Sequence, residues 1–420
     1  MSAAGIESLN IFAGSAYIGL RELAEYRQLD PARFDNLLMK EKTVALPYED
    51  PVTFAVNAAA PIVAALDPSE RDRIELLITC TESGIDFGKS LSTYVHHHLK
   101  LNRNCRLFEI KQACYSGTAG FQMALNFILS QVSPGAKALV IATDISRFMV
   151  ANSSDVLTQD WAFTEPTSGA GAAAILVGEN ATIFAPDIGA NGYYGYEVMD
   201  TCRPVADSEA GNADLSLLSY LDCCEKSFVE YEKRLASVDY KETFDALAFH
   251  VPFGGMVKGA HRTMMRKFKK ASPEDIDADF RARVLPGLTY AQRVGNIMGA
   301  SIFMSLASII DNDRADYPRR IGCFSYGSGC CSEFYSGIVP EGAHRLLQRF
   351  EIAAHLDGRK KLSVDEYAAL LESSDCVKFG TRNSKIARGA IDPLSGAAAG
   401  GARLVLNEIA EFHRQYEWVQ

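Results

Sequence analysis

The chain has 420 residues, enough for two or three domains or for one large duplicated fold. Hydrophobic residues make up 48% and charged residues 22%, which excludes a disordered, collagen-like or coiled-coil chain. The 42 basic and 52 acidic residues give a formal net charge of −10, so an acidic partner would need a local basic patch.

The apolar runs and the cysteines bear on location and partners. No apolar run reaches the roughly 18 residues of a membrane-spanning helix, and the N-terminus lacks the basic and apolar regions of a signal peptide. The ten cysteines form no Cys-x-x-Cys pair, and the adjacent pairs Cys223–Cys224 and Cys330–Cys331 suit neither a disulfide framework nor a zinc site. We therefore expect a cytoplasmic protein with reduced thiols, no bound metal, and no membrane or nucleic-acid partner.

Short apolar runs alternate with longer amphipathic segments, which is typical of a layered α/β fold. In chain order we predict strands at Ile74–Thr79, Arg106–Ile110, Ala138–Ala142, Ala172–Val177, Ala246–Phe249 and Ile321–Phe324. After the second strand, apolar residues recur at helical spacing from Phe121 to Val132, and Pro134 with Gly135 ends that helix.

Two stretches depart from this alternation. Residues 180–245 are richer in tyrosine, glycine and charge, so we predict a cap or insertion between two halves of the chain. Residues 271–285 are polar and are predicted to form a surface excursion.

Reactive side chains follow four of the predicted strands. Glu82 comes after the first strand, Cys114 after the second, His250 after the fifth, and the turn Gly327-Ser328-Gly329 after the sixth. Ligands of layered α/β proteins bind beyond the carboxyl ends of strands, so we expect these groups to share one site.

Each of these residues has a catalytic and a structural interpretation. Cys114 precedes a helix whose N-terminal dipole favours thiolate, but a small buried cysteine is the alternative. His250 stands at a strand end as a candidate proton donor, or as a histidine satisfied by local hydrogen bonds. Glu82 is a candidate base whose pKa desolvation would raise, or an ordinary acid near a helix start.

Two further polar features could support chemistry at such a site. The Asn296 amide precedes an apolar helix and could orient a histidine or a substrate carbonyl, or simply cap that helix. The turn at Ser328 could offer a backbone N–H to an oxyanion, or be a tight turn without a ligand.

A basic run at residues 261–270 contrasts with the acidic chain. Arg262, Arg266, Lys269 and Lys270 fall at i, i+4, i+7 and i+8, and Lys267 lies between them. On one helix face these charges predict a dock for a phosphate or an acidic carrier, although a solvated helix face is the alternative.

Six motifs, in order along the chain, resemble those of the hydroxymethylglutaryl-CoA synthases of the thiolase superfamily. They are Thr81-Glu82, Ala113-Cys-Tyr-Ser-Gly-Thr-Ala119, Pro166-Thr-Ser-Gly-Ala-Gly-Ala172, Phe249-His-Val-Pro-Phe253, Gly295-Asn296 and Phe324-Ser-Tyr-Gly-Ser-Gly329. The resemblance implies a duplicated five-layer αβαβα fold, with one half at residues 1–178 and the other at residues 179–420. It also implies a homodimer.

The resemblance further implies a role for each reactive residue. Cys114 matches the nucleophile that takes acetyl from a thioester, Glu82 the base that removes a methyl proton, and His250 the residue that protonates the new alkoxide. No permanently bound cofactor is implied, because the thioester arrives on CoA or on the phosphopantetheine arm of an acyl carrier protein. The residues that match supporting positions are Tyr115, Asp144, Asn296 and Ser328.

Some positions depart from the CoA-using members of this family. Gly255 stands where those enzymes commonly carry a lysine near CoA, and the segment from Arg147 to Glu165 is longer and different. With the basic run, these departures are similar to the subfamily that installs β-branches in polyketides. That subfamily condenses acetyl from a donor acyl carrier protein with a β-ketoacyl carrier protein acceptor, and Arg33, Arg262, Arg266 and Lys267 are our candidates for binding the carrier and its arm.

Three alternatives remain open at this point. They are a CoA-dependent hydroxymethylglutaryl-CoA synthase of isoprenoid supply, a priming ketoacyl synthase, and a non-catalytic scaffold that only binds carriers. A residue such as Glu82 argues against the ketoacyl synthase, and the three intact reactive residues argue against the scaffold.

Overall fold

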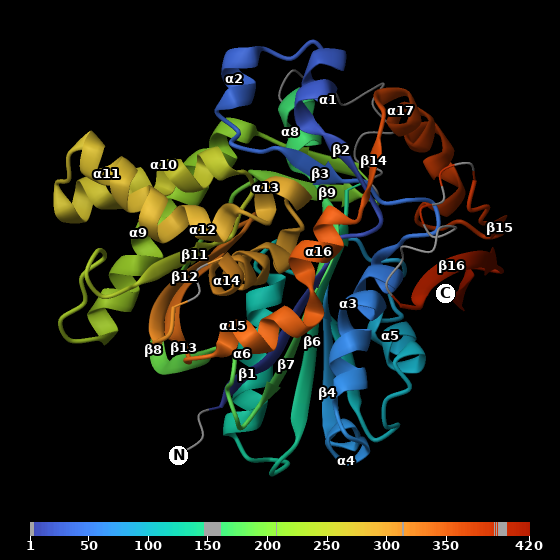
Figure 1. Ribbon diagram of the computed structural model, residues 1–420, viewed down its shortest axis with the longest axis horizontal. Coiled ribbons are helices and arrows are strands. Elements are labelled where there is room, and N and C mark those ends of the chain that lie inside the picture. The colour runs from blue at the N-terminus through green and yellow to red at the C-terminus, as the bar shows by residue number, and fades with distance from the viewer. Residues whose placement is uncertain are drawn as a thin grey trace.

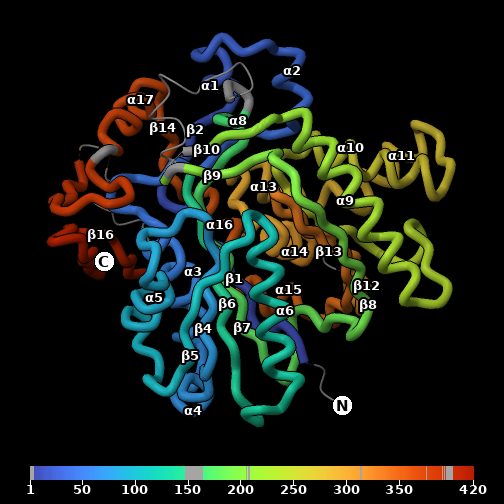
Figure 2. Tube along the Cα trace, turned by 180° about the vertical axis from the view of Figure 1, so that it is seen from behind, coloured from blue at the N-terminus to red at the C-terminus, as the bar shows by residue number. Residues whose placement is uncertain are grey.

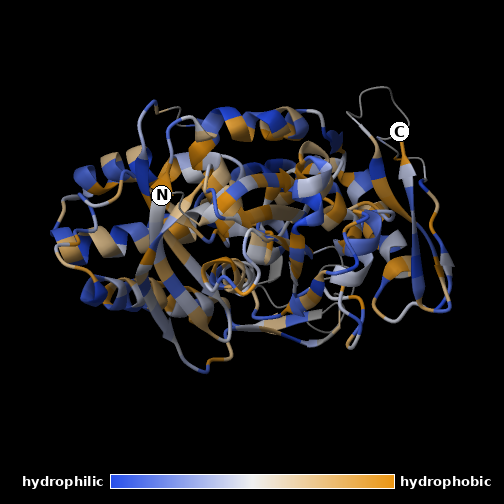
Figure 3. Cartoon of the chain, turned by 90° about the horizontal axis from the view of Figure 1, so that it is seen from below, coloured by the Kyte–Doolittle hydropathy of each residue, from blue (hydrophilic) through white to orange (hydrophobic). Residues whose placement is uncertain are grey.

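The computed structural model describes residues 4–146, 161–206, 208–312, 315–389, 391, 393 and 401–420. Two central sheets alternate with three layers of helices, which is the five-layer arrangement expected (Figure 1). Hydrophobic segments gather toward the middle of these layers (Figure 3). None of the helices in the described ranges is long and apolar enough to cross a membrane.

The first sheet has the strand order β1-β7-β6-β4-β5. Its strands are β1 (Gly5–Phe12), β4 (Ile74–Cys80), β5 (Arg106–Ile110), β6 (Lys137–Ile145) and β7 (Ala170–Gly178). The three strands β4, β5 and β6 are parallel, so their carboxyl ends meet at one edge. Every residue of β7 is buried, because helices cover both faces of this sheet.

The second sheet has the strand order β11-β12-β13-β8. Its strands are β8 (Ala185–Gly195), β11 (Ala246–Phe249), β12 (Arg319–Gly327) and β13 (Cys331–Val339). The parallel pair β11 and β12 again brings two carboxyl ends together. All six predicted strands are therefore confirmed, as β4, β5, β6, β7, β11 and β12.

Helices fill the space between the sheets and cover their outer faces (Figure 1). Outside the first sheet lie α3 (Pro51–Ala65) and α5 (Ser92–His98), and outside the second lie α9 (Ala213–Arg234) and α10 (Gly254–Met264). Between the sheets lie α6 (Ser116–Leu129) and α14 (Ser301–Asn312).

The central helix α6 confirms the helix predicted after Cys114, but its C-terminal end comes earlier than predicted. Its Phe121 ring lies 5.9 Å from that of Phe303 on α14 and 6.3 Å from that of Tyr335 on β13. The helix ends at Leu129, and Val132 is 59% exposed. The apolar pattern in the sequence extends beyond the end of the helix because the exposed Val132 also falls at a helical spacing.

The prediction of a cap at residues 180–245 is wrong for most of that stretch. Strand β8 pairs with β13 inside the second sheet, and α9 packs against both strands. Tyr220 and Tyr231 are core residues because their hydroxyl groups have buried partners: Tyr220 donates to the His250 carbonyl at 2.7 Å, and Tyr231 lies 2.8 Å from Ser336 Oγ. The hairpin of β9 (Thr201–Val205) and β10 (Ser208–Gly211) forms a separate two-stranded sheet, above the upper ends of the first sheet's strands (Figure 2).

Residues 271–285 are likewise not a simple surface excursion. They form α11 (Pro273–Asp279) and the turn of π-helix Phe280–Val284, which bury Ile276 and Phe280. Arg283 donates to Asp279 at 2.7 Å and to the Tyr240 carbonyl at 3.1 Å. The two buried polar residues of this stretch, Asp279 and Arg283, are thus paired with each other and with backbone, which allows them to be buried.

The C-terminal segment crosses back to the first half of the chain. β14 (Lys360–Leu362) pairs with β2 (Ala16–Gly19), next to β3 (Glu41–Thr43), and β16 (Arg403–Ala410) packs against α3. This segment therefore does not stay with the 179–420 half to which the sequence assigned it.

The remaining elements are short and connect these layers. They are α1 (Leu20–Tyr26), α2 (Pro31–Asp35), α4 (Pro68–Asp72), α8 (Trp161–Thr167), α12 (Leu285–Leu288), α13 (Ala291–Val294), α15 (Ala343–Leu347), α16 (Ile352–Asp357), α17 (Val364–Ser373), β15 (Ser384–Lys385) and β17 (His413–Val419).

Candidate active site

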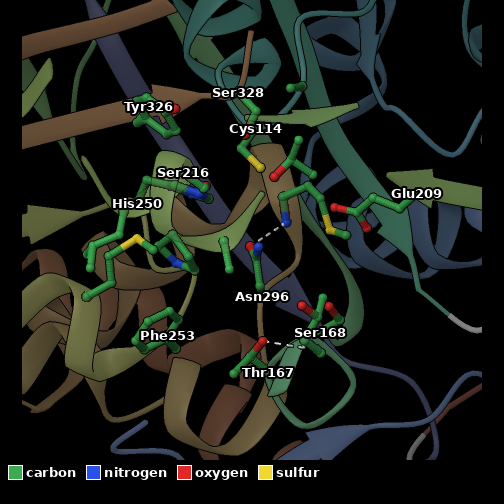
Figure 4. A pocket seen from close by; sticks show the side chains of 18 of the residues that line it. Cys114, Thr167, Ser168, Glu209, Ser216, His250, Phe253, Asn296, Tyr326 and Ser328 are labelled. Atoms are coloured by element: carbon green, nitrogen blue, oxygen red, sulfur yellow. Dashed lines mark hydrogen bonds between the residues drawn. The ribbon is translucent and has the colours of Figure 1, made fainter. Parts of the chain in front are cut away.

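A cavity of about 360 Å³ lies at the carboxyl ends of β4, β11 and β12. The structure brings the predicted residues Glu82, Cys114, His250, Asn296 and Ser328 together in its wall (Figure 4). Groups that are up to 246 positions apart in the sequence thus face one space, as the strand-end argument predicted.

Cys114 lies in the sharp turn between β5 and α6. The preceding Ala113 has a left-handed φ of 42°, a strained backbone conformation for alanine. The Cys114 Sγ lies 3.7 Å from Glu82 Oε1. Burial, with the nearby carboxylates of Glu82 and Asp144, raises the pKa of this thiol well above its usual value. The expectation that the helix N-terminus lowers the pKa of this thiol is therefore wrong, because burial and the neighbouring carboxylates raise it.

Glu82 is held by a buried carboxylate behind it. Asp144 Oδ1, on β6, accepts hydrogen bonds from Thr81 Oγ1 at 3.0 Å and from the backbone N–H groups of Glu82 at 2.9 Å and Ser83 at 3.0 Å. Burial and the Glu82 charge raise the pKa of Asp144 to about 7. Asp144 thus fixes the turn that carries Glu82 and does not line the cavity.

Two charged residues of the site were missed from the sequence. Arg203 on β9 places Nε 3.5 Å from Glu82 Oε2, and it donates from Nη1 to the Glu82 carbonyl at 3.1 Å. Glu209 on β10 lines the cavity, and burial raises its pKa to about 7. Both residues lie in the stretch predicted as a cap. The sequence pattern there does not indicate burial, because charged residues are usually exposed.

His250 is fixed by its backbone at the end of β11. Its N–H donates to the Phe324 carbonyl at 2.7 Å, and its own carbonyl accepts from Tyr220. The imidazole Nδ1 is buried and has no hydrogen-bond partner in the described part of the chain. Burial lowers the pKa of His250 to about 3, so the ring is neutral at neutral pH.

Asn296 and Ser328 close two further sides of the cavity. Asn296 Oδ1 accepts from the Met298 N–H and from Ser301 Oγ, both at 2.9 Å, so the amide Nδ2 is the group oriented for a ligand. The turn before Ser328 packs on the Cys114 loop so closely that a Cβ on Gly327 would lie 2.5 Å from the Tyr115 nitrogen. Glycine at 327 therefore allows Ser328 to lie beside the nucleophile.

Tyr115 is placed outside the cavity. Its hydroxyl donates to Glu333 Oε2 on β13 at 2.7 Å, and Gln122 and Asn191 also donate to that carboxylate. This buried network links α6 to the second sheet. Tyr115 therefore supports the position of the Cys114 loop and does not contact a ligand in the cavity.

The candidate carrier-binding residues fall into two groups. Arg33 on α2 lines the cavity, whereas Arg262, Arg266 and Lys267 are exposed on α10 and the following turn and do not line it. Lys267 forms an ion pair with Glu225. The run was predicted as one helical face, but α10 ends at Met264 and continues as a turn of π-helix, which changes the spacing of the charges.

Three further features singled out in the sequence are possible metal ligands, the cysteines and the segment from Arg147 to Glu165. Within the ranges described, no group of three or more His, Cys, Asp or Glu side chains could hold a metal ion. All ten cysteines carry free thiols, and Cys223 Sγ lies 3.5 Å from Cys330 Sγ. Most of the Arg147–Glu165 segment lies outside the described residues.

The chain was compared with known families and proteins. Residues 2–182 match the model of the hydroxymethylglutaryl-coenzyme A synthase N-terminal region, and residues 262–414 match that of the C-terminal region. The hydroxymethylglutaryl-CoA synthase of Enterococcus faecalis is 33% identical over 87% of this chain and 91% of its own.

Two further relatives are more similar to this chain. The polyketide biosynthesis 3-hydroxy-3-methylglutaryl-ACP synthase PksG of Bacillus subtilis (strain 168) is 65% identical over the full length of both chains, and a solved structure of PksG superposes with a TM-score of 0.95. The curacin pathway synthase in complex with acetyl donor-ACP is 60% identical, covers 99% of this chain and 100% of its own, and has a TM-score of 0.94. Together with the site at the strand ends, these matches show that the chain belongs to the hydroxymethylglutaryl-CoA synthase family.

Proposed function

We propose that this protein is a hydroxymethylglutaryl synthase that condenses acetyl from a donor acyl carrier protein with a β-ketoacyl carrier protein, as in polyketide β-branching. The observation that carries this proposal is the 3.7 Å contact between Cys114 and Glu82 in a cavity shared with His250. The full-length identity of 65% to a 3-hydroxy-3-methylglutaryl-ACP synthase supports the carrier-bound substrates.

The first step transfers acetyl to Cys114. The thiol sulfur attacks the thioester carbonyl, the bond to the carrier's phosphopantetheine sulfur breaks, and the thiol proton passes to that departing sulfur. The acetyl group stays activated as a thioester on the protein. Because the Cys114 thiol is protonated in the resting protein, it loses its proton during this step and not before it.

The second step forms the carbon–carbon bond. Glu82 removes a proton from the methyl group of acetyl-Cys114, and the enolate attacks the acceptor's β-carbonyl. The backbone N–H of Cys114 and the turn at Ser328 are our candidates for stabilising the enolate oxygen.

The charge of the His250 ring determines how the new alkoxide is protonated. Its ring is neutral, so it polarises the β-carbonyl as a hydrogen-bond donor and can give up its proton only if another group replaces it. Glu82 holds the proton taken from the methyl group and supplies it. Water then hydrolyses the Cys114 thioester, and the sulfur regains its proton.

The entrance of the site favours a carrier over CoA. A Cβ on Gly255 would lie 1.9 Å from the Asn36 carbonyl, so the first turn of α10 leaves no room for the lysine common in CoA-using members. Arg33 lines the cavity from α2, next to this contact. We propose that Arg33 guides the phosphopantetheine arm and that exposed Arg262, Arg266 and Lys267 attract the acidic carrier.

A cytoplasmic homodimer completes the proposal. Strand β5 is an edge of the first sheet and, within the part of the chain that the structure describes, pairs with β4 alone. Beside it, Arg106 lies 5.8 Å over the Phe127 ring of α6, and Met123, one helical turn earlier, is 48% exposed. An unpaired strand edge flanked by exposed apolar side chains suits pairing with a second copy.

The test is acetyl transfer to Cys114, read by intact mass. We expect rapid labelling by acetyl-carrier and slow labelling by acetyl-CoA. Cys114→Ser should show no adduct. Glu82→Gln should still load acetyl, because removing the Glu82 charge does not hinder ionisation of the Cys114 thiol. It should not condense, because the base that removes the methyl proton is gone. A strong preference for free acetyl-CoA would favour the isoprenoid enzyme, and no adduct from either donor would favour a non-catalytic scaffold.

Docking is tested with a charge reversal. Arg266→Glu should slow labelling by acetyl-carrier at least several-fold and leave labelling by a small acetyl thioester unchanged. Lys385→Glu, which makes the same charge change at an exposed site on β15, is the control. Equal carrier kinetics for both variants would contradict docking at Arg266.

A further inference from the structure

The β9–β10 hairpin places a second carboxyl group and a guanidinium beside the Glu82 turn. In the antiparallel pairing Ala210 is opposite Cys202, and Ser208 is opposite Val205, with an irregularity between them. Arg203 and Glu209 therefore occupy neighbouring positions across the hairpin. Figure 4 shows Glu209 reaching into the same cavity as Cys114 and Asn296.

Arg203 holds the Glu82 turn at three points. Its Nε lies 3.5 Å from Glu82 Oε2, and its Nη1 donates to the Glu82 carbonyl at 3.1 Å and to Ser83 Oγ at 3.2 Å. The side chain of Glu82 is 17% exposed and that of Arg203 is 14% exposed, so water screens this contact weakly. The guanidinium occupies Oε2 while Oε1 faces Cys114.

We propose that Arg203 is a positioning residue that aims Glu82 at acetyl-Cys114. This inference rests on the proposed role of Glu82 as the condensing base. Nothing in the six sequence motifs includes Arg203 or Glu209.

Several titratable side chains crowd this turn, and Arg203 carries the one positive charge among them. They are Cys114 before α6, Asp144 on β6, Arg203 on β9 and Glu209 on β10. Without the guanidinium, none of these groups would hold Glu82 Oε2, so the carboxylate could turn away from Cys114. Loss of Arg203 should therefore slow proton removal from acetyl-Cys114 more than it slows acetyl loading.

The experiment measures single-turnover condensation of preloaded acetyl-enzyme and, separately, the rate of acetyl loading. Relative to wild type, Arg203→Met should slow condensation at least tenfold while acetyl loading changes less. Arg203→Lys should restore part of the condensation rate, because it keeps the charge but not the three-point geometry.

Two controls separate the outcomes. Arg382→Met removes the same charge at an exposed site and should leave both rates unchanged. Circular dichroism and thermal melts identify variants that fail to fold, and Arg203→Lys keeps the test valid if Arg203→Met unfolds. Equal slowing of loading and condensation, or no slowing of either, would overturn the inference. Normal condensation by Glu82→Gln would instead overturn the proposed role of Glu82.

Discussion

At the scale of single residues, the site depends on carboxyl groups that are buried close together. Asp144 accepts hydrogen bonds from three successive residues of the turn at Thr81, and burial raises its pKa to about 7. A carboxyl in such a place is easier to protonate in the folded chain than in the unfolded chain, where the usual value is near 4. Its geometry supports catalysis, but its ionisation opposes folding.

This cost gives a pH prediction for Asp144→Asn. Between the unfolded and folded pKa values, the folded state binds more protons, so the group's contribution to stability falls as pH rises from about 4 to about 7. Asparagine keeps the accepting oxygen but cannot ionise. The free energy of unfolding of Asp144→Asn relative to wild type should therefore rise across this window and level off above pH 7.

The measurement is urea unfolding at several pH values, with the slope bounded by about 1.4 kcal/mol per pH unit for one group. Asp365→Asn, an exposed position on α17, should show no such slope. A difference between Asp144→Asn and wild type that stays constant from pH 4 to pH 8 would contradict the raised pKa.

At the scale of elements, the entrance is set by the packing of α10 against the loop after α2. The Gly255 N–H donates to the Leu37 carbonyl at 3.1 Å, and the backbone contact at Asn36 excludes any side chain at 255. Leu37 and Asn36 both line the cavity, so this contact shapes the cavity wall on that side.

Gly255→Ala should therefore destabilise the protein and disturb the entrance. Relief of a 1.9 Å contact requires α10 or the α2 loop to move, at a cost of about 1–3 kcal/mol. We expect a lower Tm and a raised KM for acetyl-carrier. Gly259→Ala is the matched control on the same helix: nothing lies within 4 Å of its Cβ, so it should be neutral or stabilising by about 0.5–1 kcal/mol. Equal Tm values for the two variants would show that the α10 contact is not tight.

At the scale of the whole molecule, the free edge at β5 makes a prediction about assembly. Met123→Glu places a charge beside that edge and should convert a dimer to a monomer at micromolar concentration, as measured by sedimentation velocity. Leu218→Glu, at a 63% exposed position on α9 in the opposite outer layer, should leave the dimer intact. A monomeric wild type, or a Met123→Glu variant that stays dimeric, would contradict pairing at this edge.

Strands and reactive residues could be read from the sequence where burial leaves a simple pattern. Ala172–Val177 is apolar throughout because β7 is covered on both faces, and His250 could be placed at a strand end because it follows the apolar run Ala246–Phe249. The tyrosine-rich stretch was misjudged because a tyrosine with a bonded hydroxyl packs as core while it scores as polar.

The sequence by itself determined the layers, the order of the motifs and the family, because periodic burial and strand-end chemistry are local properties. Only the tertiary structure decided the charge states and the neighbours of the reactive groups. Desolvation of Cys114 and His250, and the approach of Arg203 and Glu209 to the Glu82 turn, arise from elements far apart in the chain. Electrostatic energies depend on the distances between groups and on their burial, and the sequence gives neither for residues that are far apart in the chain.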